Sequence, residues 1–240
     1  MRRGRSLLAA AFLGALARPA PAAGPAPAGS VTFLAGEATR LAGGKAGKLA
    51  LGSPVHENDV LETRTRTRLE LTLRDGSIVR LGPRAKVRLA TAAFGRSPDD
   101  RQVSVELVVG EVWARVKKAV GADARFEVQT ETAVAGVRGT TFRVDARADR
   151  SCVVKVYAGA VAVAGGSVPR LVHPGGAQER EQVPGPHEVT REQWERLVGK
   201  MMQIAVAPDG TPGDPEAFAL AAPGQDEWEA WNRARDGAEE

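Results

Sequence analysis

The sequence predicts an all-β protein, either a twisted β-solenoid-like domain or a sandwich, followed by a short α-helical extension at the C-terminus. Three observations predict this fold. Apolar and polar side chains alternate through most of residues 31–189, the runs recur at about 8 to 12 residues, and Gly-bearing turns separate them. The hydrophobic content of 43% is sufficient for a core, which must consist mainly of Val, Leu and Ala because aromatic residues are few.

Residues 1–23 have the pattern of a secretory signal peptide. A basic start precedes an apolar run from Leu7 to Leu16, and Ala20-Pro21-Ala22 fits the small-residue cleavage rule. The run is too short to span a bilayer, which takes about 20 apolar residues. We therefore expect cleavage near Ala22 or Ala23 and a periplasmic or secreted product; a retained amphiphilic anchor is the alternative.

The formal net charge of +4 does not indicate a nucleic-acid partner. Residues 1–23 contain four arginines and no acid, so their removal leaves 29 basic and 29 acidic side chains. Charge is nevertheless uneven, because residues 31–172 hold 23 basic and 15 acidic side chains, whereas residues 173–240 hold 6 and 14. We expect no membrane span after cleavage. One hypothesis is that the acidic C-terminal part docks on the basic β domain; the alternative is a solvated tail.

The β domain is expected to cover residues 31–189, after a flexible Pro/Ala/Gly spacer at residues 24–30. Its central stretch runs from Leu61 to Leu89. Alternation from Thr63 to Leu73 predicts a strand with a neutral-to-apolar face and a charged face. Asp75-Gly76-Ser77 then forms a turn, because Asp bonds its own downstream backbone and Gly supplies a positive φ.

Three arginines, Arg64, Arg66 and Arg68, share the charged face of the predicted central strand. Guanidinium groups pair with carboxylates and phosphates through two hydrogen bonds, so this row is a candidate surface for an anionic ligand or partner. An edge strand protected from aggregation by its charge would show the same pattern. The residues alone leave both interpretations open.

Further alternating strands are predicted on both sides of this stretch. They cover residues 31–34, 38–41, 103–109, 112–116, 126–130, 134–137, 142–146, 152–156 and 161–163. Gly110 is expected at a hairpin or bend, and Gly159 breaks a later run. Arg138-Gly139-Thr140 joins two strands, and a buried pair of Arg138 with Asp145 or Glu131 is one option. Cys152 alternates with two valines, which favours a buried thiol over a reactive one.

Residues 190–240 form the predicted acidic extension, with one or two helices. Thr190 and Gln193 fit a capping box, and apolar residues from Trp194 to Val206 recur at helical spacing. A second, weaker helix is expected at residues 215–222 or 226–235. We expect the Trp194 and Leu197 side of the first helix to make the docking contact.

Several short motifs occur in a fixed order between residues 51 and 163. They are Gly52, Asp59–Thr63, Asp75-Gly76-Ser77, Gly110-Glu111-Val112, Val137–Val144 and Val156–Val163. This ordered set resembles the FecR domain family, whose best-known members relay iron-siderophore signals across the bacterial inner membrane. The matching motif residues, expected to be structural, are Asp75, Gly76, Ser77, Gly110, Arg138, Gly139, Thr140, Phe142 and Gly159.

The resemblance implies a β-solenoid-like or sandwich domain in the periplasm. Family members that regulate sigma factors also have a cytoplasmic helical domain and a transmembrane helix. Here the sequence begins with a signal-peptide pattern instead, so the chain is similar to the simpler exported members. Anti-sigma activity of this polypeptide alone is not expected.

No residue constellation points to catalysis. The three histidines, His56, His173 and His187, are far apart in sequence and have no second ligand at metal-binding spacing. The Gly-x-Ser-x-Gly elbow of hydrolases does not occur. We expect no catalytic residues, no cofactor and no metal.

The sequence therefore predicts a non-catalytic FecR-like module that binds a protein partner or an anionic envelope ligand, with a role in envelope sensing or signalling. The alternative is a structural or scaffold protein of the cell envelope. No nucleic-acid partner is expected in either case.

Overall fold

The computed structural model describes residues 26–95, 100–119, 124–166 and 195–238. Within them, 17 strands form one hydrogen-bonded, open set that is arranged as two layers, sheet A and sheet B. Sheet A runs in the order β4 (Pro54–Val55), β1 (Gly29–Ala35), β6 (Arg68–Leu73), β7 (Ile78–Leu81), the second part of β9 (Arg101–Arg115), β12 (Thr141–Ala146), β13 (Cys152–Ala158), β16 (Met202–Val206) and β17 (Glu216–Ala217). Sheet B runs in the order β3 (Lys45–Lys48), β2 (Ala38–Ala42), β5 (Val60–Thr63), β8 (Lys86–Phe94), the first part of β9, β10 (Arg125–Gln129), β11 (Ala133–Val137), β14 (Val161–Gly165) and β15 (Glu195–Val198).

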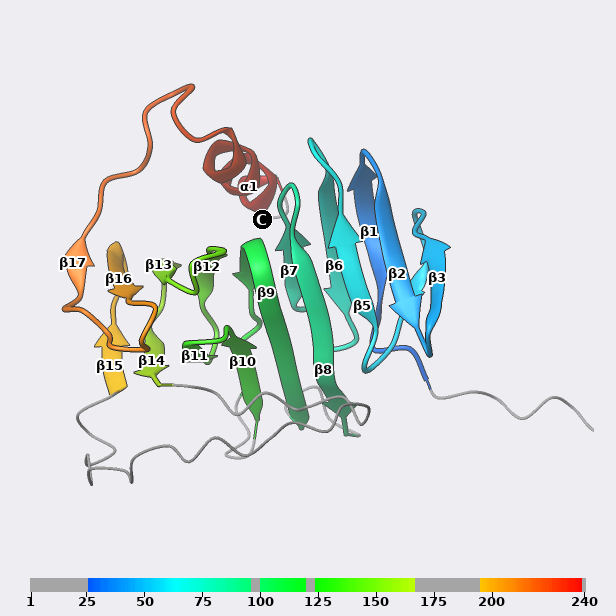
Figure 1. Cartoon of the computed structure of the whole chain (residues 1–240), viewed down its shortest axis with the longest axis horizontal. Coiled ribbons are helices and arrows are strands. Elements are labelled where there is room, and N and C mark those ends of the chain that lie inside the picture. Colours follow the sequence, from blue (N-terminus) through cyan, green and yellow to red (C-terminus); the bar gives the residue numbers. More distant parts are fainter. Residues whose placement is uncertain (1–25, 96–99, 120–123, 167–194, 239–240) are drawn as a thin grey trace, which may run out of the picture.

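The strands follow the sequence along the long axis of the molecule, from β1, β2 and β3 at one end to β15, β16 and β17 at the other (Figure 1). The helix α1 (Glu227–Gly237) lies against the middle of this arrangement. β9 and β10 pair in parallel, and the other pairings between described strands are antiparallel. The prediction of an all-β fold with a short C-terminal helix is confirmed.

The core lies between the two sheets and follows the predicted alternation. Six side chains that test the pattern are each at most 3% exposed: Leu69, Leu71, Val105, Leu107, Val154 and Val156. Cys152 is 1% exposed in the same core, and burial raises the pKa of its thiol. The sequence interpretation of Cys152 as a buried small side chain is therefore confirmed.

The predicted break at Gly110 is a bend within one continuous strand rather than a hairpin. Before Gly110, β9 pairs with β8 in sheet B, and from Gly110 onward it pairs with β12 and β7 in sheet A. Gly110 has φ +101°, and a Cβ there would lie 2.6 Å from the Cα of Ala85. Only glycine fits this conformation and this close approach, so Gly110 is the residue at which β9 passes from one layer to the other.

The predicted helix from Trp194 to Val206 is wrong. Where the structure describes this range, it forms β15 and β16, which extend sheets B and A beside β14 and β13. Val198 and Ile204 are fully buried, whereas Leu197 is 72% exposed, so alternation rather than helical spacing decides the structure. Thr190, Gln193 and Trp194 lie outside the described residues.

The helix of the C-terminal part is α1, which overlaps the second of the two ranges predicted for a weaker helix and ends two residues beyond it. The spacer at residues 24–30 is shorter than predicted, because β1 begins at Gly29 and Ala28 is 3% exposed. The backbone N–H of Ala28 also donates to the Val55 carbonyl at 2.8 Å. The predicted signal peptide lies outside the described residues.

Candidate functional site

The central stretch does not form the single strand on which Arg64, Arg66 and Arg68 were predicted to share a face. β5 ends at Thr63, a tight turn follows, and β6 begins at Arg68. Two buried hydroxyls hold this turn: Thr63 donates to the Gly82 carbonyl at 2.6 Å, and Thr67 to the Glu37 carbonyl at 2.9 Å. Arg64 and Arg66 therefore project from a turn, and Arg66 has a left-handed φ of +58°.

Arg84 joins these two arginines from a neighbouring turn, which connects β7 to β8. Its backbone N–H donates to the Arg64 carbonyl at 3.3 Å, so the two turns lie side by side. Arg64, Arg66 and Arg84 are exposed, and within the described residues their side chains form no hydrogen bond or ion pair. We call these three residues the arginine rim; sequence spacing gave no signal that Arg84 belongs to it.

Arg68 has a different environment from the arginine rim. Its guanidinium lies 5.3 Å from the ring centroid of Trp231 and 3.9 Å from a carboxylate oxygen of Glu227, both on α1. The same Glu227 lines a surface pocket together with Arg66, Arg68 and Arg84. The arginine rim thus borders the N-terminal end of α1.

The turn at Asp75-Gly76-Ser77 is confirmed, and it has a structural role. Asp75 accepts from the Ser77 N–H at 2.9 Å and from its hydroxyl at 2.7 Å, and Gly76 has φ +77°. The sequence pattern did not reveal that Asp75 also forms an ion pair with Arg101, whose side chain is 3% exposed. This buried pair ties the turn between β6 and β7 to the start of β9.

The segment around Arg138 is also structural. Thr140 donates to the Ala160 carbonyl at 3.0 Å, and Phe142 is fully buried in the core. Gly139 and Gly159 both have positive φ, at +65° and +83°. Arg138 itself is exposed, and its two predicted partners pair elsewhere: Asp145 with Arg143 at 2.5 Å and Glu131 with Arg150 at 3.2 Å.

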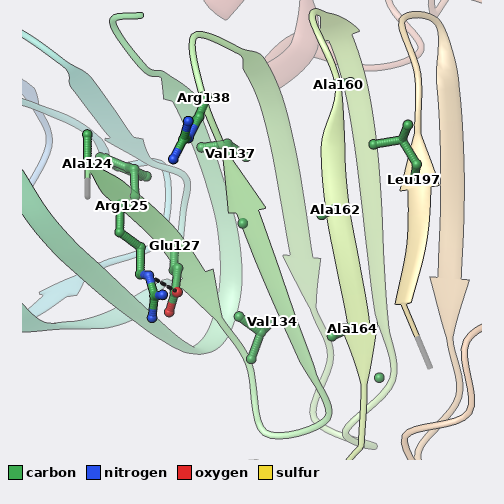
Figure 2. Close-up of a pocket in the computed structure, with 13 residues that line it drawn as sticks. Ala124, Arg125, Glu127, Val134, Val137, Arg138, Ala160, Ala162, Ala164 and Leu197 are labelled. Carbon is green, nitrogen blue, oxygen red and sulfur yellow. Dashed lines mark ion pairs between the residues drawn. The ribbon is translucent and has the colours of Figure 1, made fainter. Parts of the chain in front are cut away.

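A shallow groove of about 680 Å³ lies on the outer face of sheet B, over β10, β11, β14 and β15. Figure 2 shows Ala160, Ala162 and Ala164 along its floor and Leu197 at one margin. Arg125 and Glu127 form an ion pair of 3.4 Å near the opposite margin. The floor is apolar because small side chains occupy the outward positions of these strands.

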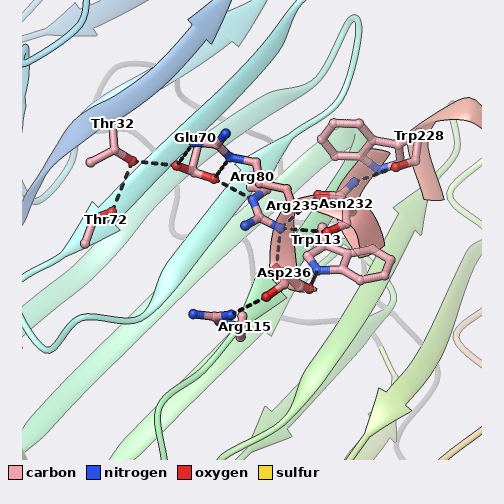
Figure 3. A network of polar contacts seen from close by, with 10 residues as sticks. All are labelled: Thr32, Glu70, Thr72, Arg80, Trp113, Arg115, Trp228, Asn232, Arg235 and Asp236. Atoms are coloured by element: carbon pink, nitrogen blue, oxygen red, sulfur yellow. Dashed lines mark hydrogen bonds and ion pairs between the residues drawn. The ribbon is translucent and has the colours of Figure 1, made fainter. Parts of the chain in front are cut away.

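The outer face of sheet A carries a polar network that α1 covers (Figure 3). Arg80 of β7 is 0% exposed and pairs with Glu70 of β6 at 2.7 Å and with Asp236 of α1 at 2.5 Å. Asp236 also accepts from the Trp113 indole N–H at 3.0 Å, and Arg235 donates to Glu70 at 2.5 Å. The charged face predicted for the central stretch, residues 61–89, exists on β6 and β7, but α1 shields the centre of this face from solvent.

Glu70 is held ionised within this network. Burial alone would raise its pKa, but hydrogen bonds from Arg235, Arg80 and Thr32 outweigh that effect and hold the pKa at about 2. Thr32 contributes from β1, where its hydroxyl donates to Glu70 at 2.9 Å. Carboxylates and guanidiniums therefore alternate across the contact between β6, β7 and α1.

A second cluster surrounds Arg143 of β12, near the N-terminus of α1. Its guanidinium donates to Asp226 and Asp145 at 2.5 Å each and to Glu111 at 2.9 Å. Burial raises the pKa values of Glu111 and Asp145 despite the nearby guanidinium. Burial also opposes the ionisation of Asp226, but hydrogen bonds from the backbone N–H of Glu229 and from Arg143 lower its pKa. Asp226 is the N-cap of α1, so the cluster fixes the start of the helix.

Aromatic side chains fill the space between the two charged clusters. The Trp113 and Tyr157 rings lie 4.3 Å apart, and both are buried with Trp228 of α1. The Tyr157 hydroxyl donates to Glu229 at 3.0 Å, and burial raises the pKa of this phenol. Docking of the C-terminal part on the β domain, hypothesised from its charge, therefore occurs in the structure. It occurs through α1, and Leu197 is exposed rather than part of the contact.

One comparison with known proteins finds a family domain in the central part of the chain. Residues 59–162 match the family model described as FecR protein. The chain carries a FecR domain. This match begins just before β5 and ends within β14, so it includes the arginine rim, the Asp75 turn and Gly110. β1 to β4, β15 to β17 and α1 lie outside the matched range of the FecR domain.

Among solved structures, two crystal structures of a protein described as a predicted anti-sigma factor from Parabacteroides distasonis ATCC 8503 are similar to this chain. They have 21% and 20% sequence identity and TM-scores of 0.45 and 0.46. Each alignment covers 66% of this chain and 59% of the other, so this chain spans less than two thirds of their length. No curated protein matches the chain.

The described residues contain neither a membrane-spanning helix nor a metal-binding group of side chains. In the part of the chain that the structure describes, no helix has the length and apolar character needed to cross a membrane. His, Cys, Asp and Glu side chains of the described residues do not gather into a group that would hold a metal ion.

Proposed function

We propose that this FecR-domain protein is a non-catalytic binding module of the bacterial envelope that takes part in sensing or signalling by contacting an acidic protein partner. The FecR domain and the signal-peptide pattern of residues 1–23 support this proposal. The observation that carries it is the arginine rim, because its three guanidiniums are exposed and have no partner within the described residues.

Several buried or half-buried arginines of the described protein pair with nearby carboxylates, whereas those of the rim do not. Arg88 pairs with Glu106, Arg101 with Asp75, and Arg143 with three carboxylates. A guanidinium offers five donors in a planar fork, which suits two-point contacts with carboxylates. Three such groups on two rigid, adjacent turns form a preorganised surface for an acidic patch, and no side chain of the described protein has to be displaced first.

The test compares a rim variant with a charge-matched control in the full chain. Arg64, Arg66 and Arg84 are each changed to Glu in one protein, and Lys45, Lys48 and Lys200, all exposed, are changed to Glu in the other. Chemical crosslinking in the envelope is followed by identification of the bound proteins. We expect a stoichiometric partner that the control retains and the rim variant loses at least tenfold.

Other outcomes of the same experiment would count against the proposal. A partner captured equally by both variants would place the contact elsewhere. Binding of the unmodified chain to vesicles of anionic phospholipid, weakened equally by both sets of substitutions, would indicate attraction by general charge. Crosslinking of the chain only to itself would favour the scaffold alternative. Unfolding curves in urea should coincide for both variants, because all six residues are exposed.

A further inference from the structure

The outer face of sheet A has the features of a docking site for a helix. Its charged and aromatic groups form a row that matches α1 from one end to the other. Arg143 holds Asp226 at the N-cap at 2.5 Å, Tyr157 donates to Glu229 at 3.0 Å, and Arg80 holds Asp236 in the last turn at 2.5 Å. These three carboxylates therefore each meet a donor that projects from a different strand, β12, β13 or β7.

The helix is attached in a way that permits its release without loss of a strand. Residues 218–226 connect β17 to α1; they have no regular secondary structure and are mostly exposed. Helix α1 has 11 residues, and isolated helices shorter than about 12 to 15 residues are marginal in water. Its helical structure consequently depends on the contact with sheet A, so docking and folding of this segment are coupled.

The side chains beneath α1 determine which kinds of helix can cover this surface. Arg80 and Trp113 are 0% and 1% exposed in the docked state, and release of α1 would uncover both. Glu70 of the sheet binds the Nε side of the Arg80 guanidinium at 2.7 Å, and its Nη1 side needs an acceptor from the covering helix, which Asp236 supplies. The indole N–H of Trp113 also requires an acceptor, which Asp236 supplies at 3.0 Å. An apolar helix would leave the Nη1 group of Arg80 and the indole N–H of Trp113 without the acceptor that Asp236 gives them.

We propose that this face of sheet A is a docking site for an acidic helix of a partner protein, and that the helix buries an indole side chain in the site. In the free chain, α1 occupies the same site. The partner helix presents carboxylates at the spacing of Asp226, Glu229 and Asp236 and an aromatic side chain at the position of Trp228. The arginine rim is not part of this contact, so the proposal stands or falls separately from the proposed function.

The test uses the full chain with a weakened α1. In the loosened variant, Glu229→Ala and Asp236→Ala remove two of the three carboxylate contacts and leave sheet A unchanged. A fluorescent peptide with the natural sequence of residues 219–240 then competes for the site. We expect it to bind the loosened variant at least tenfold more tightly than the unmodified chain, where the tethered helix competes at an effective concentration of order millimolar. The same peptide with both substitutions is the control and should bind neither protein.

A second peptide distinguishes a site that can bind the helix of another protein from a contact that only α1 can make. It retains only Asp226, Trp228, Glu229, Trp231 and Asp236 on an unrelated Ala/Lys helical scaffold. Binding of this peptide to the loosened variant supports the proposal. Failure of the designed peptide while the natural one binds overturns it, because recognition would then need the whole α1 sequence. Equal binding of the natural peptide to both proteins also overturns it.

Hydrogen exchange of the unmodified chain provides a measurement that does not depend on how well the loosened variant folds. Release of α1 requires that its backbone amides exchange through an opening smaller than global unfolding. We expect the amides of Ala230 to Ala234 to exchange at least tenfold faster than those of Val144 and Val154 in sheet A. Equal protection would show that α1 leaves only when the whole domain unfolds, and that result would contradict the proposal.

Discussion

Arg80 and Asp236 form an ion pair of 2.5 Å across the contact between β7 and α1, and the Arg80 side chain is 0% exposed. Asp236→Ala would leave this guanidinium with Glu70 as its remaining carboxylate partner on the sheet. We expect a loss of about 2 to 3 kcal/mol in the free energy of unfolding, at the lower end for a broken buried pair because Glu70 remains. Urea unfolding followed by tryptophan fluorescence measures it.

Glu227→Ala is the control for this prediction. Glu227 lies on the same helix, but its side chain is 82% exposed and its distance from Arg68 is 3.9 Å. Exposed pairs of this kind contribute little, so the unfolding curve should barely move. Equal losses for the two variants would mean that helix propensity, and not the pair with Arg80, determines the result.

The low pKa of Glu70 predicts a pH dependence of stability. Its pKa falls from 4.5 to about 2 on folding, so its ionised form stabilises the protein above pH 4.5, and this contribution is lost as the pH falls toward 2. Glu70→Gln removes the titration. We expect the difference in unfolding free energy between the unmodified protein and the variant to shrink by about 3 kcal/mol between pH 5 and pH 2.

Both proteins in that comparison retain Glu111 and Asp145, whose raised pKa values act with the opposite sign. Their contributions cancel in the difference between the two proteins. A difference that stays constant across this pH range would show that Glu70 is not held ionised by Arg80 and Arg235.

The ion pair of Asp75 with Arg101 leads to a stability prediction, and a second turn of the same chain provides its control. Asp75→Ala leaves Arg101, whose side chain is 3% exposed, without its carboxylate, and we expect a loss of about 3 kcal/mol in urea unfolding. Asp149 makes the same turn contacts with Ser151, at 2.9 and 2.7 Å, but is exposed. Asp149→Ala should therefore cost much less. Similar losses would assign the effect to the turn and not to the buried pair.

The close approach at Gly110 leads to another stability prediction. Gly110→Ala forces a side chain into a conformation with φ +101° and places its Cβ 2.6 Å from the Cα of Ala85. We expect a loss of about 2 to 4 kcal/mol. Gly136→Ala in β11 is the control, because a Cβ there would meet its nearest atom at 3.9 Å. Its cost should stay within about 0.5 kcal/mol, and a larger cost than that of Gly110→Ala would refute the explanation.

The alternation of side chains predicted most of the fold, because in a two-layer sheet the period of two directly reports which side chains face the core. Val105, Leu107 and Val154 were placed correctly for this reason. The same pattern failed from Trp194 to Val206, where several apolar residues also fit helical spacing. There the open edges of β13 and β14 decide the structure, and neither edge is visible in a local sequence window.

The candidate site was harder to predict, since its contacts join distant parts of the chain. Alternation placed Arg80 on the charged face, but its burial depends on Asp236, 156 positions later. Arg64 and Arg66 were recognised as candidates in a strand, whereas they project from a turn. Arg84 was missed, because its place beside Arg64 depends on a backbone hydrogen bond between two turns. The excess of acid in residues 173–240 gave the one early indication that the C-terminal part would dock.

The passage of β9 through both sheets has a mechanical consequence. A single backbone joins the edge of the groove on sheet B, through β10, to the strands beneath α1, through β12. The two layers cannot slide past each other near Gly110 without breaking the hydrogen bonds of that strand. The two outer faces of the protein are therefore connected near Gly110 by one continuous strand as well as by packing.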